Sequence, residues 1–557
     1  MRRLLRFILP GIICFAADLP AQTPQKYWVQ FTDKNNSPYS ISNPSAYLGS
    51  RALTRRTSQG IAIDSLDLPV NPAYVSGVAA TGVSMLGKSK WLNGVIIFTN
   101  DTNALLTIQS LPYVSTMFNV GREREKPQDK FNETFSETIH NQRTGAMNAS
   151  TINYGPSFTQ INMLGGVCLH NAGFLGQGMH IAVIDAGFWS VDTVNAFDSL
   201  WTNNRILGTW DFVQNNASVY EDDTHGMMVL SCMGGNLPGQ VVGTAPEASY
   251  WLLRSEEAAT EHVVEEYLWS AAAEFADSVG ADVINSSLGY TQFDNPAENH
   301  VFATDMNGNV CPSSVAADFA ASRGIAVVVS AGNSGSGSWR MIGAPADADS
   351  ALAIGAVDSA ELIAGFSSHG FSADGDVKPN VCAQGSGAVV AAPGGGTWNA
   401  NGTSFSSPIT AGLVACLWQA HPNMTNMQVL QNIEMSADRF GNPDTLYGYG
   451  IPDFCAANIT LGGTGGMNFN EGDQISGVGP NPFTDKIEFS YFATIPQQIH
   501  VELYDIRGRM LMHEILNAQK NSVNRFSIGQ LETVEQGLYL LRITSATGEW
   551  THKLVKK

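Results

Sequence analysis

The sequence predicts an α/β protein whose main domain is a mostly parallel β-sheet flanked by helices. Short apolar runs such as residues 180–185 and 325–331 alternate with helical patterns such as residues 262–279. Strands that are apolar at nearly every position are buried on both faces, as happens when helices cover a parallel sheet. The chain has 557 residues, of which 44% are hydrophobic and 14% charged, so we expect about three or four globular units.

The start of the chain is typical of a secretory signal. Arg2, Arg3 and Arg6 precede an apolar stretch that is too short to span a bilayer, and Ala21 offers a small residue for cleavage. No later apolar run reaches the length of about 18 residues that a membrane helix needs. We therefore expect an exported protein that is not an integral membrane protein.

Charge and cysteine content limit the partners and the compartment. The net charge of −20 repels phosphate backbones, so we expect no nucleic-acid partner. Of seven cysteines, Cys14 lies in the signal, which leaves 7 − 1 = 6 in an oxidising compartment. Six cysteines are compatible with disulfides and with buried free thiols, and the sequence does not choose between them.

Composition divides the chain into successive segments. Strands over residues 27–31 and 93–99 and a helix over residues 46–59 predict a small α/β domain near the start. The charged, aperiodic stretch that follows indicates an exposed connector or a processing segment. The predicted boundaries are 1–21 for the signal, 22–120 for the first domain, 121–153 for the processing segment, 154–460 for the main domain, 461–476 for a Gly-rich linker and 477–557 for a C-terminal domain.

The C-terminal domain is predicted to be a small β-sandwich. Apolar residues recur there with strand-like spacing between glycine turns, namely Val501, Leu503, Ile506, Leu538, Leu540 and Ile543. Short strands separated by such turns are typical of antiparallel sheets that pack face to face.

Three residues of the main domain form a candidate catalytic set. Asp185 ends an apolar strand, His225 stands at a helix start, and Ser404 lies at the N-terminus of a long apolar helix. A serine hydroxyl is a weak nucleophile until an imidazole accepts its proton, and the imidazole needs a buried carboxylate that fixes its tautomer. Gly402 is expected to allow a tight backbone turn before Ser404.

A fourth residue completes the candidate site. Asn333 follows the strand at residues 325–331, where its side-chain amide is placed to donate a hydrogen bond to the oxyanion of a tetrahedral intermediate. Polar residues at the carboxyl ends of parallel strands are the ones that meet a ligand in such folds.

The motifs around these residues resemble the successive signatures of the subtilisin-like serine peptidases over residues 154–460. They read AVIDAGF, THGMMV, INSSLG, SAGNSG, FSSHG and GTSFSSPITAG, and the order Asp, His, Ser is the subtilisin order. The resemblance implies Asp185 as the orienting carboxylate, His225 as general base and then acid, Ser404 as nucleophile and Asn333 as oxyanion donor. It also implies that the cleft which binds an extended polypeptide substrate is lined by Ser287, Leu288, Gly289, Ala331 and Gly332.

Two positions depart from the family pattern. Met227 stands where a threonine usually follows His-Gly, and Phe405 stands where a methionine usually follows the serine. Both positions lie beside the proton path, so we expect them to affect rate or specificity rather than the presence of activity.

The outer domains carry looser resemblances. Residues 22–120 resemble the inhibitory propeptides of these peptidases, which implies a zymogen that cleaves itself within residues 121–153 and then has its own propeptide as a partner. Residues 480–483, 501–511 and 536–557 resemble the C-terminal sorting domain of the type IX secretion system. That resemblance implies export across the inner and outer membranes with the type IX machinery as partner, followed by secretion or attachment at the cell surface. A generic β-sandwich binding module is the alternative.

Other functions and ligands are weighed against this interpretation. A surface binding protein that kept the fold and lost turnover is the main alternative, and an esterase is disfavoured because the chain has no G-x-S-x-G. Catalysis by this residue set requires no cofactor, and we expect a monomer. Asp305 and Asn307 offer oxygen ligands for a structural calcium ion, but the run lacks a full ligand set and favours a turn.

A cluster of acidic residues admits two interpretations. The cluster comprises Glu256, Glu257, Glu261, Glu265 and Glu266. It is either an acidic rim that selects basic peptides or a solvated helix face, and the composition favours the solvated face.

Overall fold

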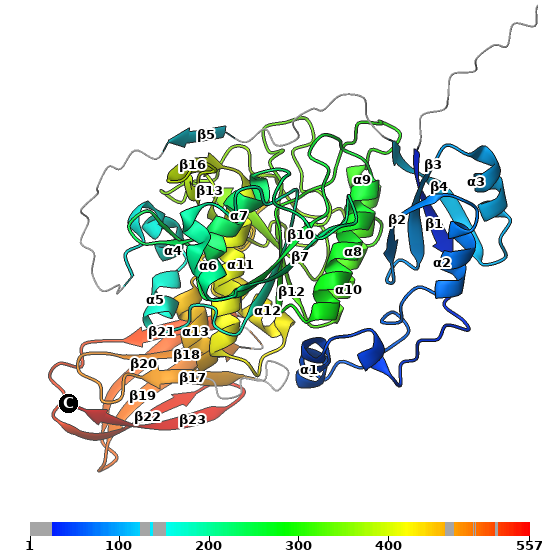
Figure 1. Ribbon diagram of the computed structural model, residues 1–557. Coiled ribbons are helices and arrows are strands. Elements are labelled where there is room, and N and C mark those ends of the chain that lie inside the picture. Colours follow the sequence, from blue (N-terminus) through cyan, green and yellow to red (C-terminus); the bar gives the residue numbers. More distant parts are fainter. Residues whose placement is uncertain are drawn as a thin grey trace, which may run out of the picture.

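The structure is a computed structural model in which three parts follow one another along the chain (Figure 1). It describes residues 25–122, 134–137, 152–462, 473–493, 495, 497–518 and 522–557. The predicted signal at residues 1–21 lies outside these residues. The N-terminal domain lies beside helix α8 (Val264–Val279) of the central domain, and the C-terminal domain lies beside helix α13 (Phe454–Gly462) (Figure 1).

The central domain is built on a seven-stranded sheet in the order β14-β13-β12-β11-β6-β10-β7. All of its neighbouring strands pair in parallel. The strands are β6 (His180–Asp185), β7 (Ile206–Asp211), β10 (Ser249–Arg254), β11 (Val283–Ser286), β12 (Ala326–Ser330), β13 (Leu352–Val357) and β14 (Val381–Gln384). The predicted mostly parallel sheet is therefore confirmed, and the expected apolar strands form its middle.

Helices cover both faces of this sheet, which explains why its strands are apolar throughout. Ile181 and Val183 of β6 point to the core under α7 (His225–Gly234) and α11 (Thr403–Ala420). Ala182 and Ile184 point to the opposite core under α8 (Val264–Val279) and α10 (Pro312–Ser322). Successive side chains of a strand alternate between faces, so two buried faces require an unbroken apolar run.

The N-terminal domain is a four-stranded antiparallel sheet in the order β2-β3-β1-β4 with helices on one side. Its elements are β1 (Gln25–Phe31), α1 (Ser50–Ser58), α2 (Pro72–Ala79), β2 (Ser84–Ser89), β3 (Gly94–Thr99), α3 (Thr102–Gln109) and β4 (Val114–Arg122). The expected strands at residues 27–31 and 93–99 match β1 and β3 closely.

Buried ion pairs attach this domain to α8. Arg55 and Arg56 of α1 both donate to Asp277 Oδ1 of α8, at 2.6 and 2.7 Å, and Lys90 Nζ lies 2.9 Å from Asp277 Oδ2. These cations hold the pKa of the buried Asp277 carboxyl far below its usual range, against the effect of burial. Loss of one of these partners would leave an uncompensated buried charge, which destabilises a protein strongly. The contact between the two domains therefore depends on this set of charged residues.

The C-terminal domain consists of two antiparallel sheets, β17-β18-β21 and β20-β19-β22-β23. Its strands are β17 (Gln474–Gly479), β18 (Ile487–Ala493), β19 (Gln497–Asp505), β20 (Met510–Ala518), β21 (Ser522–Ile528), β22 (Gly537–Thr544) and β23 (Glu549–Lys556). Val501, Leu503 and Ile543 lie in the core between the sheets, as their spacing suggests. Leu538 is exposed because the buried face of β22 carries Tyr539 and Leu541 instead, and Ile506 is exposed in the turn that follows β19.

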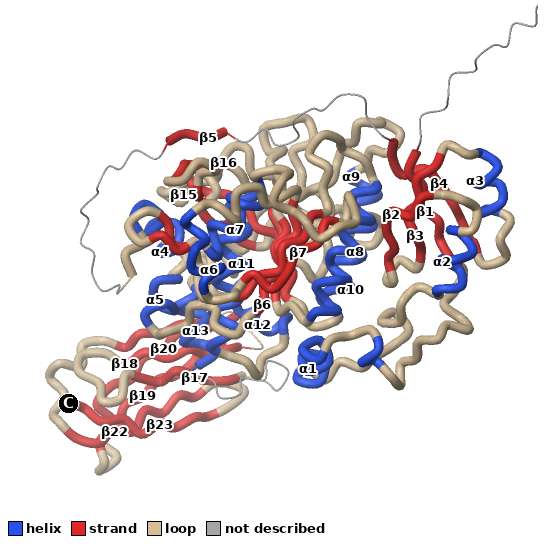
Figure 2. The backbone as a smooth tube through the Cα atoms, viewed as in Figure 1, coloured by secondary structure: helices blue, strands red, loops and turns tan. Residues whose placement is uncertain are grey.

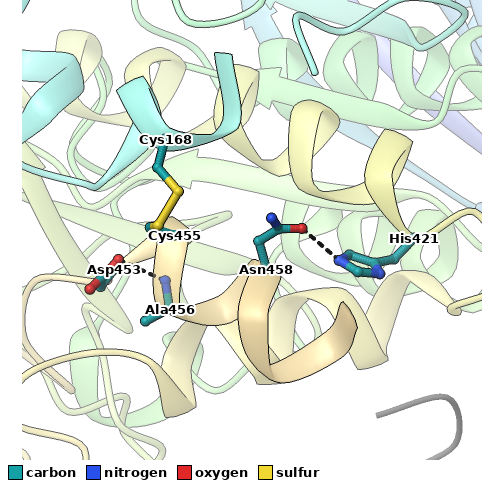
Figure 3. The surroundings of a disulfide bond; sticks show 6 residues. All are labelled: Cys168, His421, Asp453, Cys455, Ala456 and Asn458. Carbon is teal, nitrogen blue, oxygen red and sulfur yellow. Dashed lines mark hydrogen bonds between the residues drawn. A yellow bond between two sulfur atoms is a disulfide. The ribbon is translucent and has the colours of Figure 1, made fainter. Parts of the chain in front are cut away.

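A disulfide joins two helices that are far apart in the sequence. Cys168 of α5 (Gly166–Asn171) is bonded to Cys455 of α13 (Phe454–Gly462), 287 residues later (Figure 3). Next to it, Asp453 accepts a hydrogen bond from the Ala456 amide (Figure 3). Four further cysteines among the described residues are buried and not disulfide-bonded: Cys232, Cys311, Cys382 and Cys416. The structure thus contains both of the alternatives that the sequence left open.

None of the helices in the described part of the chain combines the length and the apolar character that a membrane crossing requires.

Candidate active site

The candidate site begins with a buried aspartate–histidine pair. Asp185 ends β6 and His225 begins α7, and the Asp185 Oδ1 oxygen lies 2.6 Å from His225 Nδ1. Both side chains are at most 1% exposed. Burial raises the pKa of the Asp185 carboxyl, while the neighbouring His225 opposes that rise. The same Oδ1 accepts a hydrogen bond from the Ala186 amide at 2.8 Å, which fixes the carboxylate in position.

A glycine allows the histidine to approach the aspartate. A Cβ at Gly226 would lie 2.4 Å from the Gly187 carbonyl oxygen and 3.0 Å from the Asp185 Cβ. Any larger residue after His225 would therefore push α7 away from the end of β6. The His-Gly pair of the sequence motif has a steric cause in this close packing.

Ser404 lies in the first turn of α11, where the helix dipole favours negative charge. Pro408 lacks the amide hydrogen that would bond the Ser404 carbonyl. The Ser287 hydroxyl donates to that carbonyl instead, at 2.8 Å, and so ties α11 to the end of β11. The chain bends at Gly402, as expected, but φ 164° and ψ 147° are extended backbone that does not require a glycine.

Hydrogen bonds from Thr403 fix the orientation of the Asn333 side-chain amide. Its Oδ1 accepts hydrogen bonds from the Thr403 amide at 2.8 Å and from the Thr403 hydroxyl at 2.9 Å. The Thr403 hydroxyl oxygen in turn accepts from the Gly332 amide at 3.1 Å. With Oδ1 fixed in this way, the Nδ2 amide of Asn333 is the group left to donate to a ligand beside Ser404. The sequence pattern had not indicated this role of Thr403.

Ser404 and Asn333 line one cleft of about 510 Å³. The residues proposed from the sequence to contact substrate line it as well: Ser287, Leu288, Gly289, Ala331 and Gly332. The cleft also contains residues that sequence reasoning did not assign: Glu256, Glu261, Thr291, Ser330, Ser334, Met341, Gly343, Phe366, Ser368, Asn401 and Thr403. Asp185 and His225 are not among its lining residues.

The two departures from the family pattern are both buried. Phe405 follows Ser404, and its ring centroid lies 6.3 Å from that of His225. This contact places the aspartate–histidine pair next to the start of α11. Met227 lies in the core under α7 and does not line the cleft.

The acidic cluster differs from the solvated helix face that the sequence favours. Glu256, Glu265 and Glu266 are at most 1% exposed, and Glu256 lies before α8 rather than on it. Glu266 accepts hydrogen bonds from Ser313 and lies 2.6 Å from His300 Nε2. The expectation of a solvated face is therefore wrong, because these carboxylates find specific donors inside the domain.

The candidate calcium ligands do not gather into a ligand cage. Asp305 accepts hydrogen bonds from the Val301 amide and the Thr304 hydroxyl, both at 2.7 Å. Asn307 accepts from the Asn309 amide at 3.0 Å. Each side chain thus stabilises its own turn.

A covered parallel sheet that carries a buried aspartate–histidine pair, with a serine at the start of a helix beside a cleft, is the arrangement of a serine-type peptidase. Comparison with known proteins gives the family. Residues 176–450 match the Subtilase family, residues 26–134 match the Peptidase S8 propeptide domain of Bacteroidota, and residues 478–557 match the Secretion system C-terminal sorting domain.

Characterised relatives agree with these matches. The chain is 32% identical over 313 residues to Subtilisin E of Bacillus subtilis (strain 168), covering 56% of this chain and 72% of the relative. It is 32% identical over the same length to Subtilisin of Bacillus pumilus, covering 56% of this chain and 99% of the relative. It is 30% identical over 289 residues to Subtilisin Savinase of Lederbergia lenta, covering 52% of this chain and 93% of the relative.

The chain therefore belongs to the subtilase family and is a serine-type endopeptidase. It carries an N-terminal propeptide domain of the S8 type, as expected for a zymogen. Its C-terminal domain is a secretion sorting domain, so the protein is exported and is secreted or attached at the surface.

Proposed function

We propose that this endopeptidase hydrolyses peptide bonds with Ser404 as nucleophile, His225 as general base and acid, and Asp185 as orienting carboxylate. The observation that carries the proposal is the buried 2.6 Å contact between Asp185 and His225, at the carboxyl end of the sheet that also presents Ser404. Asp185 holds the Nδ1 hydrogen of His225, which leaves Nε2 to accept the proton of the Ser404 hydroxyl.

The steps then follow from the chemistry of these groups. The Ser404 oxygen attacks the scissile carbonyl as its proton passes to His225, and the carbonyl oxygen becomes negative. The Asn333 amide donates to that oxygen. His225 returns the proton to the leaving amine, and a water molecule repeats the sequence to release the acyl group from Ser404.

The experiment is covalent labelling with a serine-directed organophosphorus reagent, together with a casein zymogram. We expect one modified peptide that contains Ser404, and loss of casein hydrolysis in proportion to labelling. Ser404→Ala protein serves as the control and should take up no label. Unlabelled Ser404 in correctly folded, processed protein would favour the alternative of a surface binding protein without turnover.

We further propose that the protein cuts its own chain between Arg122 and Thr134. β4 of the propeptide ends at Arg122, and β5 (Thr134–Glu137) pairs antiparallel with β16 (Thr397–Asn401), with Thr134 opposite Asn401 (Figure 1). Asn401 lines the cleft three residues before Ser404, so the amino-terminal end of β5 points toward the nucleophile. Most of the predicted processing segment, 121–153, lies outside the described residues.

Purified Ser404→Ala protein tests self-cleavage. We expect it to stay full length, while the wild-type chain yields a new N-terminus between residues 122 and 134 by mass spectrometry. Normal trimming of the purified Ser404→Ala protein would show that processing does not require Ser404.

The proposed partners are polypeptide substrates, the propeptide and the type IX secretion machinery. The proposed oligomeric state is a monomer.

A further inference from the structure

Three carboxylates meet at one end of the cleft. Glu256 and Glu261 line it, and Glu265 stands behind them on α8. Their nearest oxygens all lie within 4.8 Å of one another. We call Glu256, Glu261 and Glu265 the acidic wall.

Several of the hydrogen bonds to the acidic wall come from neutral groups. The Tyr290 hydroxyl donates to Glu256, while the amides of Glu257 and His262 donate to the two oxygens of Glu265, each at 3.1 Å. Such donors fix carboxylates without cancelling their charge. Glu256 and Glu265 are almost fully buried, so solvent ions screen their negative charge only weakly. Glu261 is partly exposed in the cleft, so the negative potential of the three carboxylates extends into the cleft.

The end of the propeptide gives a separate indication of what this wall binds. A Cβ at Gly121 of β4 would lie only 3.0 Å from the Cβ of His262, next to the wall. The propeptide therefore reaches the cleft at this end. The sequence from Arg122 to Lys126 reads REREK, so three of its five residues are basic.

The direction of the chain assigns the wall to one side of the cleaved bond. Gly121 lies at the wall, and β5, which comes later in the chain, lies beside β16 at the Ser404 end. A substrate bound with the same polarity places residues that precede its cleaved bond near the wall.

We propose that the acidic wall selects substrates with an arginine or lysine on the amino-terminal side of the cleaved bond, within a few residues of it. This inference rests on the proposed function. Glu261 is the member open to the cleft, and it meets the basic group directly. Glu256 and Glu265 strengthen the charge that this group encounters.

The test is a series of fluorogenic peptides in which arginine replaces alanine at each of five positions before the cleaved bond. With the processed wild-type enzyme, we expect one position where arginine raises kcat/KM by about tenfold or more over the all-alanine peptide. Glu261→Gln should reduce that ratio to less than about threefold, because its amide carries no charge for the arginine to meet. Added salt should also lower the wild-type ratio.

A matched variant separates the wall from general changes in charge. Glu257→Gln removes a neighbouring carboxylate that lies 3.5 Å from Arg254 and does not line the cleft, so the ratio should not change. No preference for arginine at any position, or the same ratio in Glu261→Gln, would overturn the inference and leave the proposed function intact. If Ca²⁺ raises the melting temperature of wild type but not of Glu261→Gln, and no basic preference exists, the wall is a cation site and the inference is wrong. Failure to cleave any peptide, with Ser404 unlabelled, would overturn the proposed function and the inference together.

Discussion

The proposed oxyanion donor, Asn333, is oriented by Thr403. Asn333 Oδ1 accepts hydrogen bonds from both the amide and the hydroxyl of Thr403, one residue before the proposed nucleophile. The helix that presents Ser404 therefore also sets the direction of the Asn333 amide. A change at Thr403 should act on catalysis through Asn333 rather than through substrate binding.

Substitution of these two residues should lower kcat by different amounts. We expect Asn333→Ala to reduce kcat by about 10²–10³-fold with little change in KM, the loss found for the equivalent donor of the related subtilisin. Thr403→Val keeps the backbone donor and loses only the hydroxyl, so its kcat should fall by roughly tenfold or less. Steady-state kinetics on one peptide measures both. A rise in KM with unchanged kcat would place Asn333 in ground-state binding instead.

Sequence reasoning reached the candidate catalytic residues because each follows a recognisable local pattern. Asp185 ends an apolar strand, and His225 and Ser404 start helices. The role of Thr403 could not be predicted, because its partner Asn333 lies 70 residues away along the chain. The burial of the glutamates was missed for the same reason, since their donors come from distant segments such as Tyr290.

At the scale of elements, a histidine links a loop to two helices. His300 Nε2 lies 2.6 Å from Glu266 of α8, and Glu266 also accepts from the hydroxyl of Ser313 in the first turn of α10. Burial acts to lower the pKa of His300, but the hydrogen bond and charge of Glu266 outweigh it and raise that pKa above 6.5. The folded protein therefore holds this proton more tightly than the unfolded chain does.

The sign of the resulting pH dependence follows from linkage. Stability from protonated His300 is fully present below the unfolded pKa near 6.5, and it is lost as pH rises through the higher folded pKa, at up to about 1.4 kcal/mol per pH unit. In the Ser404→Ala background, His300→Gln should remove this loss of stability above pH 6.5. Urea unfolding at several pH values measures it, and an unchanged slope would contradict the prediction.

A second histidine provides a control of opposite sign. Burial lowers the pKa of His421, which lies 2.9 Å from Asn458 on α13 (Figure 3). The stability that neutral His421 contributes is lost as pH falls from 6.5 through the lower pKa of the folded state. His421→Gln should therefore change the free energy of unfolding only below about pH 6.5.

The elements themselves were predictable where burial dictates a simple pattern. Because the central strands are apolar on both faces, their sequences predicted a sheet that is covered by helices on both sides. Helix α2 and strand β2 of the propeptide were not predicted, because β2 has the mixed sequence SMLGKS and α2 contains a glycine. In β22, side chains alternate between the core and the surface, and Tyr539 and Leu541 rather than Leu538 face the core. The sequence pattern had assigned Leu538 to the core instead.

At the scale of the whole molecule, the regulatory and sorting parts lie apart from each other (Figure 2). The propeptide packs on α8 through the buried pairs of Arg55 and Arg56 with Asp277. The C-terminal domain contacts the peptidase domain through β17 and α13, and α13 carries the disulfide to α5. We therefore expect that inhibition by the propeptide and export by the sorting domain can be changed separately.

Removal of the C-terminal domain should separate export from catalysis. None of the residues that line the cleft comes from the sorting domain, and that domain has a hydrophobic core of its own. We expect a chain that ends at residue 462 to keep kcat/KM within about twofold on a peptide substrate, because the cleft and the disulfide remain. The same chain should accumulate inside the cell envelope, as measured by fractionation and immunoblotting. The control is intact Ser404→Ala protein, which keeps the sorting domain and should reach the surface or the medium. Normal export of the shortened chain would show that the export signal lies outside the C-terminal domain.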